Sequence, residues 1–459
     1  MTAVYEIDTW PWLEGLSRRY GRTVTLGDVP GEVWDELQGF DAVWLMGVWE
    51  RSPAGLAIAL TNEGLRREFH HALPDLSDKD VVGSPYCVRR YEVDQHLGGR
   101  TGLEEARRQL RKRNKKLILD YVPNHVAPDH PAITEHPDWF INGTPDDLAD
   151  NPTHWFKAGD HVIAHGRDPY FPPWPDVAQL NAFHPGLRKA TVETLKAIAE
   201  QCDGVRVDMA MLMFNDIFAR TWGEHAGPKP AREFWPEVVQ ALPADFLLIA
   251  EAYWDTEWAL QQQGFHLCYD KRLYDRLAHE DAGAVRSHLR ADRAYQDRLI
   301  RFIENHDEPR AAAAFGPRHR AAAVAIATLP GATLWHDGQF EGRRVKLPVF
   351  LGRYPDEPVD EDLRAFYGKL GKVRINTGEW HLLDTHDVLA WTWRDGDSRH
   401  LVVVNFAGST ARTRVRVPWF PEKPQWRLTD LLDGRVFDRS GNEDLYVELP
   451  PWGFHVLQG

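Results

Sequence analysis

The chain has 459 residues, of which 43% are apolar and 27% are charged, as in an ordinary globular protein with one large or several smaller cores. Its formal net charge is −14, so nucleic acid and anionic membranes are poor partners, because phosphate groups require a basic face. No apolar run is long enough to span a bilayer, and three scattered cysteines indicate neither a disulfide framework nor a zinc site. With no basic-then-apolar leader at the start, we expect a cytoplasmic protein.

Strand-like and helix-like segments alternate through the first three-quarters of the chain. Residues 40–48 form a continuous apolar run, which is typical of a strand buried on both faces. Thr101 and Glu104 form a capping box that predicts a helix as far as about residue 116. Further strands are expected at 117–122, 204–209, 245–251, 299–307 and 332–338, with helices at 185–201 and 318–328. This βα alternation and the chain length favour an α/β fold, the (β/α)8 TIM barrel.

Two segments interrupt the alternation. Residues 127–183 are rich in Pro, Asp, Trp and His and lack periodicity, so we interpret them as a small domain inserted in the barrel. Residues 378–459 have the period-two pattern of antiparallel strands and predict a C-terminal β-sandwich. The barrel would then comprise residues 1–126 and 184–377.

Polar side chains follow four of the predicted strands, at the barrel end where active sites lie. Each could be structural by itself, as a hydrogen-bonding group, an ion pair or a helix cap. Together they are hard to explain structurally, because burying several like charges at one end of a barrel is costly. The side chains are Asp120 and His125, Arg206 and Asp208, Glu251, and His306 and Asp307.

This set suits the cleavage of a glycosidic bond. One carboxylate must attack the anomeric carbon and another must protonate the leaving oxygen. A flanking Arg keeps the nucleophile ionised, while neutral His and a third Asp can bind sugar hydroxyls. The chain also has 19 Trp residues, most of which must pack in the core, although some could form flat surfaces for sugar rings.

At these residues the chain resembles the α-amylase family, glycoside hydrolase family 13. The resemblance extends over nearly the whole chain and rests on ordered motifs. They are GSPYCVRRYEVDQHLGG (83–99), DYVPNH (120–125), WPDVAQLN (174–181), GVRVD (204–208), AE (250–251) and ENHD (304–307). The resemblance implies a barrel with a small B domain and a C-terminal β domain.

The resemblance also implies a role for each site residue. Asp208 would be the nucleophile, Glu251 the general acid/base and Asp307 the third carboxylate. The other implied substrate-site residues are Arg206, which orients Asp208; His125 and His306, which contact the sugar in subsite −1; Tyr86, which stacks beneath it; and Asp120, which supports the site from its strand end.

Some positions depart from the family pattern. Met211 and Leu212 stand where many α-amylases have Lys and His, so subsite +1 should be less polar. Arg89 and Arg90 stand where an acid is common, and could bind an anionic sugar or form ion pairs. No metal-ligand spacing stands out, so no metal or cofactor is assigned as required, and a structural calcium ion is kept only as an alternative.

Two functions in one chemical class follow. The first is a retaining hydrolase of short α-glucosides and malto-oligosaccharides that forms a covalent glycosyl-enzyme. The alternative is a transglycosylase, which the apolar Met211 and Leu212 favour slightly because a drier acceptor side disfavours water. A catalytically silent binding protein should lack one carboxylate, and all three are present. The expected partner is a small oligosaccharide, and the oligomeric state is left open.

Overall fold

Eight parallel strands close a barrel in the computed structural model, which describes residues 2–459. Around the barrel the order is β1, β15, β14, β13, β12, β11, β5 and β2. The bounds are β1 (Ala3–Asp8), β2 (Ala42–Met46), β5 (Lys116–Tyr121), β11 (Gly204–Val207), β12 (Leu247–Ala250), β13 (Leu267–Tyr269), β14 (Leu299–Arg301) and β15 (Ala332–His336). These strands are almost wholly buried, as both faces of a parallel sheet require, and the predicted TIM barrel is confirmed.

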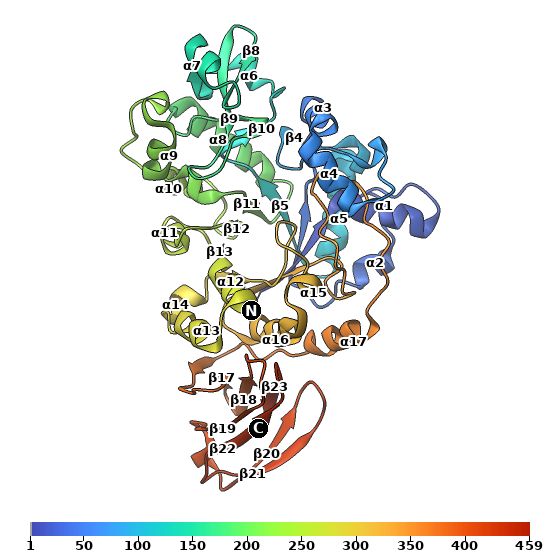
Figure 1. Ribbon diagram of the computed structural model, residues 1–459, viewed down its shortest axis with the longest axis vertical. Coiled ribbons are helices and arrows are strands. Elements are labelled where there is room, and N and C mark those ends of the chain that lie inside the picture. The colour runs from blue at the N-terminus through green and yellow to red at the C-terminus, as the bar shows by residue number, and fades with distance from the viewer. Residues whose placement is uncertain (1) are drawn as a thin grey trace. The chain divides into compact units, whose positions relative to one another are not determined.

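Helices follow the barrel strands along the chain (Figure 1). The predicted helix at 185–201 is α8 (Pro185–Ala199), and its N-cap residue His184 accepts a hydrogen bond from the Gly186 N–H. The predicted capping box at Thr101 does not begin its helix, because α5 (Gly99–Lys112) starts two residues earlier. There Gly98 and Gly99 take positive φ angles of 103° and 60°, which only glycine adopts readily, and turn the chain into the helix.

The remaining helices vary widely in length. They are α1 (Thr9–Tyr20), α2 (Gly31–Asp35), α3 (Pro53–Thr61), α4 (Glu63–Ala72), α9 (Asn215–Trp222), α10 (Phe234–Val239), α11 (Glu257–Gln262), α12 (Lys271–His279), α13 (Ala282–Leu289), α14 (Arg293–Gln296), α15 (Ala311–Ala314), α16 (His319–Thr328) and α17 (Glu361–Leu370). None of the helices in residues 2–459 has the length and apolar character needed to cross a lipid bilayer.

The segment that lacked periodicity contains an antiparallel sheet. Strands β6 (His125–Val126), β10 (Trp174–Gln179), β9 (His161–Gly166) and β7 (Asn142–Gly143) pair in that order, and β8 (Trp155–Ala158) also pairs with β9. Helices α6 (Ala132–Glu135) and α7 (Pro145–Asp150) accompany these strands (Figure 1). Side chains including Ile133, Phe140 and Ile163 form a small core of their own.

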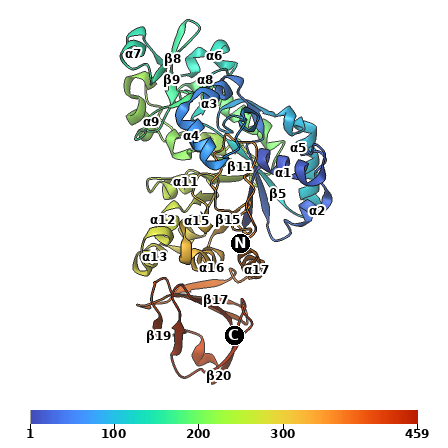
Figure 2. The ribbon, with the colours of Figure 1, turned by 45° about the vertical axis from the view of Figure 1, so that its right-hand side comes forward.

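The C-terminal strands form two antiparallel sheets, coloured red in Figure 2. The larger sheet has the order β16 (Glu379–Leu382), β17 (Leu389–Asp395), β18 (Ser398–Val404), β23 (Phe454–Gln458), β20 (Gln425–Asp430) and β21 (Val436–Ser440). The smaller pairs β19 (Ala411–Val415) with β22 (Leu445–Leu449). Both sheets contribute to one apolar core that contains Trp419 and Trp426, and the predicted antiparallel domain is confirmed.

By internal contacts the chain separates into two compact units. One runs from Tyr5 to Tyr269 and adds Lys346–Asp356, and the other contains Asp270–Val345 and Glu357–Gly459. The first unit also holds a hairpin of β3 (Trp49–Arg51) and β4 (Val88–Val93). Asp208 and Glu251 belong to the first unit and Asp307 to the second.

Candidate active site

Strand register brings the first group of predicted site residues together. In the parallel ladder, Arg206 of β11 pairs with Asp120 of β5 on one side and with Ile249 of β12 on the other. The ladder continues past the strand ends, because the Asp208 N–H donates to the Tyr121 carbonyl oxygen at 2.9 Å and the Glu251 N–H to that of Val207 at 3.0 Å. Asp208 and Glu251 therefore lie side by side at the carboxyl ends of the adjacent strands β11 and β12.

Arg206 binds both of these carboxylates. Its Nη1 lies 2.8 Å from Asp208 Oδ1 and its Nη2 lies 2.7 Å from Glu251 Oε2, while the guanidinium is fully buried. Burial lowers the pKa of Arg206, but the nearby negative charges, Glu251 foremost, outweigh it and hold the pKa well above its ordinary value. The ring of Tyr86 lies 5.1 Å from the guanidinium carbon, within cation–π range. The cation thus stays charged between two acids.

Glu251 also accepts two hydrogen bonds. The backbone N–H of Met209 donates to Oε2 at 2.7 Å, and the hydroxyl of Tyr253 donates to Oε1 at 2.9 Å. Met209 has a φ angle of 42°, a left-handed conformation that is uncommon for a residue with a side chain. Neither Tyr253 nor the Met209 backbone could be identified from the sequence, because neither position carries a charge or belongs to a recognisable motif.

Asp120 acts on the loop that follows β2. Its carboxylate accepts hydrogen bonds from Trp44 Nε1 at 3.1 Å and from the Gly47 N–H at 2.7 Å, and its side chain is wholly buried. Gly47 has a φ angle of 78°, and a Cβ there would come within 2.8 Å of Pro85. The carboxylate therefore holds a tight glycine turn beside β5, which fits the predicted supporting role of Asp120.

His125 lies in the same unit as a buried imidazole. Its ring is 5.2 Å from that of Trp174, and the Asn124 side chain lies 3.3 Å from His125 Nδ1. Burial lowers the pKa of His125, only partly offset by the charge of Asp208 and a hydrogen bond to the Tyr86 backbone. At neutral pH the ring is therefore uncharged and able to exchange hydrogen bonds with hydroxyl groups.

In the second unit, His306 and Asp307 follow the barrel strand β14. His306 Nε2 lies 3.0 Å from Asp307 Oδ2, and the Asp307 side chain is 41% exposed while that of His306 is buried. The Asn305 carboxamide oxygen accepts hydrogen bonds from the N–H groups of Asp307 and Glu308, both at 2.9 Å, which fixes the turn. Asp307 therefore presents an accessible carboxylate from a rigid loop.

The family model for the alpha-amylase catalytic domain matches residues 36–345, which include all of these side chains. The chain belongs to the alpha-amylase family, that is, glycoside hydrolase family 13. This confirms the resemblance seen in the motifs.

Known relatives agree with this membership. The chain is 27% identical to alpha-amylase MalA of Haloarcula japonica over 62% of this chain and 40% of that protein. It is 22% identical to alpha-amylase 3 of Dictyoglomus thermophilum over 60% of this chain and 55% of that protein. The matched parts thus span about half the length of these relatives or less. The crystal structure of the noncanonic maltogenic alpha-amylase AmyB from Thermotoga neapolitana superimposes with a TM-score of 0.70 at 19% identity, covering 100% of this chain and 98% of that one.

Two of the residues that depart from the family pattern lie close to Asp208 in the chain. Met211 and Leu212 lie in a 3-10 helix, η4 (Ala210–Met213), that follows Asp208. These residues are 0% and 3% exposed, so their side chains are buried from solvent, and their role in subsite +1 stays a prediction.

Arg89 and Arg90 are engaged in ion pairs on the β3–β4 hairpin. Arg89 Nη1 lies 2.7 Å from Glu50 Oε1, and Arg90 Nη1 lies 3.2 Å from the other oxygen of the same carboxylate. Arg89 Nε also lies 3.5 Å from Asp129. Both arginines are therefore already paired with acids, as the simpler of the two interpretations expected.

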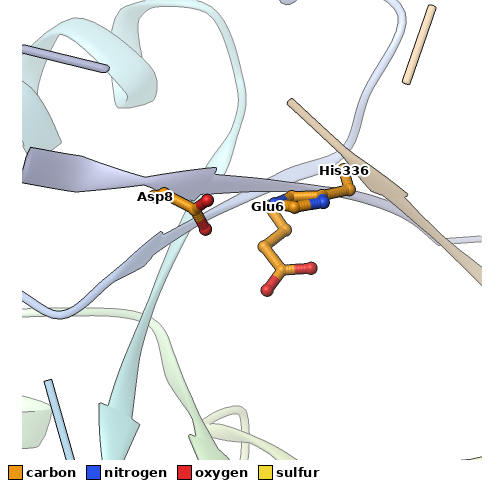
Figure 3. A group of neighbouring side chains, drawn as sticks. All are labelled: Glu6, Asp8 and His336. Atoms are coloured by element: carbon orange, nitrogen blue, oxygen red, sulfur yellow. The ribbon is translucent and has the colours of Figure 1, made fainter. Parts of the chain in front are cut away.

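β1 carries two buried acids that the sequence analysis passed over. Glu6 and Asp8 are two residues apart, so both side chains leave the same face of the strand (Figure 3). Asp8 accepts a hydrogen bond of 3.0 Å from the Tyr354 hydroxyl. In the sequence, only the alternation of these acids with apolar residues indicates that they share one face of a strand. The mostly apolar composition of the segment makes this alternation hard to recognise.

Proposed function

We propose that this member of the alpha-amylase family is a retaining α-glycoside hydrolase that acts on short α-glucosides and malto-oligosaccharides. One observation supports this most strongly: a single buried guanidinium binds Asp208 and Glu251 at 2.8 and 2.7 Å. Carboxylates that share one guanidinium lie close together. This favours the separation of about 5–5.5 Å used by retaining enzymes over the roughly 6.5–9.5 Å of inverting ones.

In the first step Asp208 attacks the anomeric carbon, and the glycosidic bond breaks as protonated Glu251 gives its proton to the leaving oxygen. In the second step Glu251 takes a proton from water, which displaces Asp208 and releases the sugar. Asp307 and His306, with His125, would bind ring hydroxyls, and Tyr86 would lie beneath the ring. The substrate, water and these residues supply every group that the reaction needs, so the proposal includes no cofactor.

Arg206 would keep the charge of the site balanced through the reaction. Before attack, Asp208 is ionised and Glu251 carries a proton. After attack, Asp208 is an uncharged ester and Glu251 is ionised. Because Arg206 lies within ion-pair distance of both carboxylates, its positive charge faces one negative charge in each state, and no charge needs to move far.

The second candidate is transfer of the glycosyl group to another sugar. Met211 and Leu212 support it, because apolar side chains just after the nucleophile would lower the local activity of water. Both reactions share the first step and differ only in which hydroxyl enters second.

Product analysis on a panel of maltose, maltotriose, a longer maltodextrin, isomaltose, sucrose and trehalose tests the proposal. We expect short products without longer ones, and the best substrate gives the linkage. Early appearance of larger or rearranged sugars would instead identify a transglycosylase. If the wild-type protein turns over no member of the panel, as measured against an Asp208→Asn blank, the proposed activity is wrong.

A further inference from the structure

A buried ion pair closes the loop that carries Asp307. Glu304 lies shortly after β14 and Arg310 directly precedes α15, and Arg310 Nη1 is 2.7 Å from Glu304 Oε1. Both side chains are only 1% exposed. The other carboxylate oxygen of Glu304 accepts a hydrogen bond of 2.7 Å from the N–H of Ala311, the first residue of α15. The two ends of the loop are therefore joined directly to each other.

The same guanidinium also binds the end of the neighbouring barrel strand. Arg310 Nη1 lies 2.8 Å from the Asp337 carbonyl oxygen and 2.8 Å from His336 Nδ1. His336 is the last residue of β15, which pairs with β14 in the barrel, so Arg310 fixes the loop to two adjacent strands. Burial raises the pKa of Glu304, but neighbouring charges, Arg310 foremost, outweigh it and hold the pKa below its ordinary value. The pair is therefore ionised at neutral pH.

Between these ends, the loop is held on both sides of Asp307. On one side, the Asn305 carboxamide oxygen accepts from the Asp307 and Glu308 N–H groups. On the other side, the carboxylate of Glu308 lies 3.1 Å from Nζ of Lys271, the first residue of α12. The Asp307 side chain nevertheless remains 41% exposed. The contacts thus fix the backbone around Asp307 and leave its carboxylate open to a ligand.

Stability alone is a poor explanation for this ion pair. Removing two charges from water costs about as much as their attraction returns, and apolar side chains of similar volume often stabilise a core equally well or better. Apolar side chains, however, cannot form the directed bonds that join both ends of the loop to β15. Such bonds matter at a reaction centre, where a group must be held within about 0.5 Å of its working position.

We infer that the Glu304–Arg310 pair is a clamp that positions Asp307 against the sugar. The inference rests on the proposed function, in which Asp307 binds ring hydroxyls. Neither member of the pair needs to touch the substrate, so both are positioning residues that act through Asp307. Because Asp307 would bind the ring most strongly in its distorted form, a looser loop should weaken binding of the transition state more than binding of the substrate. A lower kcat with little change in KM is therefore expected.

The test is the paired variant Glu304→Gln/Arg310→Met, which removes both charges at similar volume and leaves neither one buried without its partner. With α-glucosyl fluoride, whose good leaving group keeps slow variants measurable, we expect kcat to fall at least about tenfold while KM changes less than about threefold. An unchanged kcat, or a rise in KM alone, would overturn the clamp. Arg310→Lys keeps the buried charge and serves if the paired variant does not fold. Its kcat should fall at least about threefold, and an unchanged kcat would count equally against the clamp.

Two comparisons separate positioning from a general effect on folding. In an Asp307→Asn background the paired change should lower kcat less than about threefold, because a clamp that acts through Asp307 then has no carboxylate to position. An equal loss in both backgrounds would overturn the inference. The matched control is Arg399→Met/Glu422→Gln, which removes an ion pair of 2.9 Å in the C-terminal domain and should keep the wild-type kcat. The same loss of kcat in the control would also overturn it.

Hydrogen exchange distinguishes failure of the clamp from failure of the proposed function. If the wild-type protein hydrolyses neither α-glucosyl fluoride nor maltotriose, the proposed function fails. Exchange of the Asp307 and Glu308 amide protons then decides the clamp without any activity. Exchange at least about tenfold faster in the paired variant, with no change in the C-terminal control, supports the clamp. Equal exchange in all three proteins, or the same acceleration in both variants, overturns it.

Discussion

Met209 and Glu251 are joined by a hydrogen bond of 2.7 Å from the backbone N–H of one to the carboxylate of the other. A second bond of 3.1 Å runs from the Ala210 N–H to the Glu251 carbonyl oxygen. The turn after Asp208 is therefore tied to the end of β12 through the backbone as well as through Arg206. One continuous network of hydrogen bonds and ion pairs positions the two carboxylates. We therefore expect the loss of any donor in this network to lower the catalytic rate.

Replacement of the proposed nucleophile gives the first prediction. Asp208→Asn should lower kcat at least about a thousandfold while leaving the circular dichroism spectrum unchanged, because the amide is nearly isosteric but a poor nucleophile. Proton NMR of the wild-type reaction should show the α-anomer first. Fresh β-anomer would indicate inversion and a different assignment of the carboxylates.

Arg206 should not tolerate replacement by lysine. An ammonium group cannot bind two carboxylates with the geometry of a planar fork, so Arg206→Lys should lower kcat/KM at least about a hundredfold. Arg353→Lys is the matched control, since Arg353 also contacts two acids, Asp75 at 2.8 Å and Asp80 at 2.6 Å, outside the site. Equal losses in the two variants would show that the effect is not specific to the site.

Tyr253→Phe removes one donor to the candidate acid. A donor stabilises the ionised carboxylate, so its loss should favour the protonated form and move the alkaline limb of the kcat/KM profile to higher pH, by about 0.5–1 unit. The pH profile measures this directly. Tyr446→Phe loses a similar hydroxyl bond to Glu448, and its profile should match that of the wild-type enzyme. A loss of activity with no shift of the limb would assign Tyr253 a packing role instead.

Acid stability should depend on His319 of α16. Burial lowers the pKa of His319 to about 4, and the opposing charge of Glu304 does not restore it. Between about pH 6.5 and pH 4 the unfolded chain therefore binds a proton that the folded protein does not. The contribution of His319 to the free energy of unfolding is complete above about pH 6.5. It falls by up to about 3 kcal/mol as the pH drops to about 4.

The variant His319→Gln tests this assignment. Glutamine can keep a hydrogen bond to the Tyr367 hydroxyl, which lies 2.7 Å from His319 Nε2, but it does not titrate. Urea unfolding at pH 7 and pH 4.5 should show a smaller loss of stability in this variant than in the wild-type protein. His161→Gln, at an exposed position of β9, should lose stability like the wild type. Identical pH dependence in all three proteins would exclude His319 as the cause.

The sequence by itself determined the barrel and the residues at its strand ends. Continuous apolar runs identify strands buried on both faces, and parallel strands in register must bring their ends to one level. Asp120, Arg206 and Glu251 could therefore be placed from one-dimensional information. The C-terminal sheets were similarly visible, because alternation with period two is a local property of each strand.

Only the tertiary structure decided the partners of those residues. The inserted sheet was hidden because its strands are short, and because β6 and β7 pair with strands that do not follow them directly in the chain, namely β10 and β9. Tyr253 and the Met209 backbone depend on left-handed turns at ordinary residues, which nothing in the sequence announces. The physical reason is common to all of them. Composition and periodicity record which face of an element is buried, whereas hydrogen bonds and ring contacts depend on where the chain is directed after the element ends.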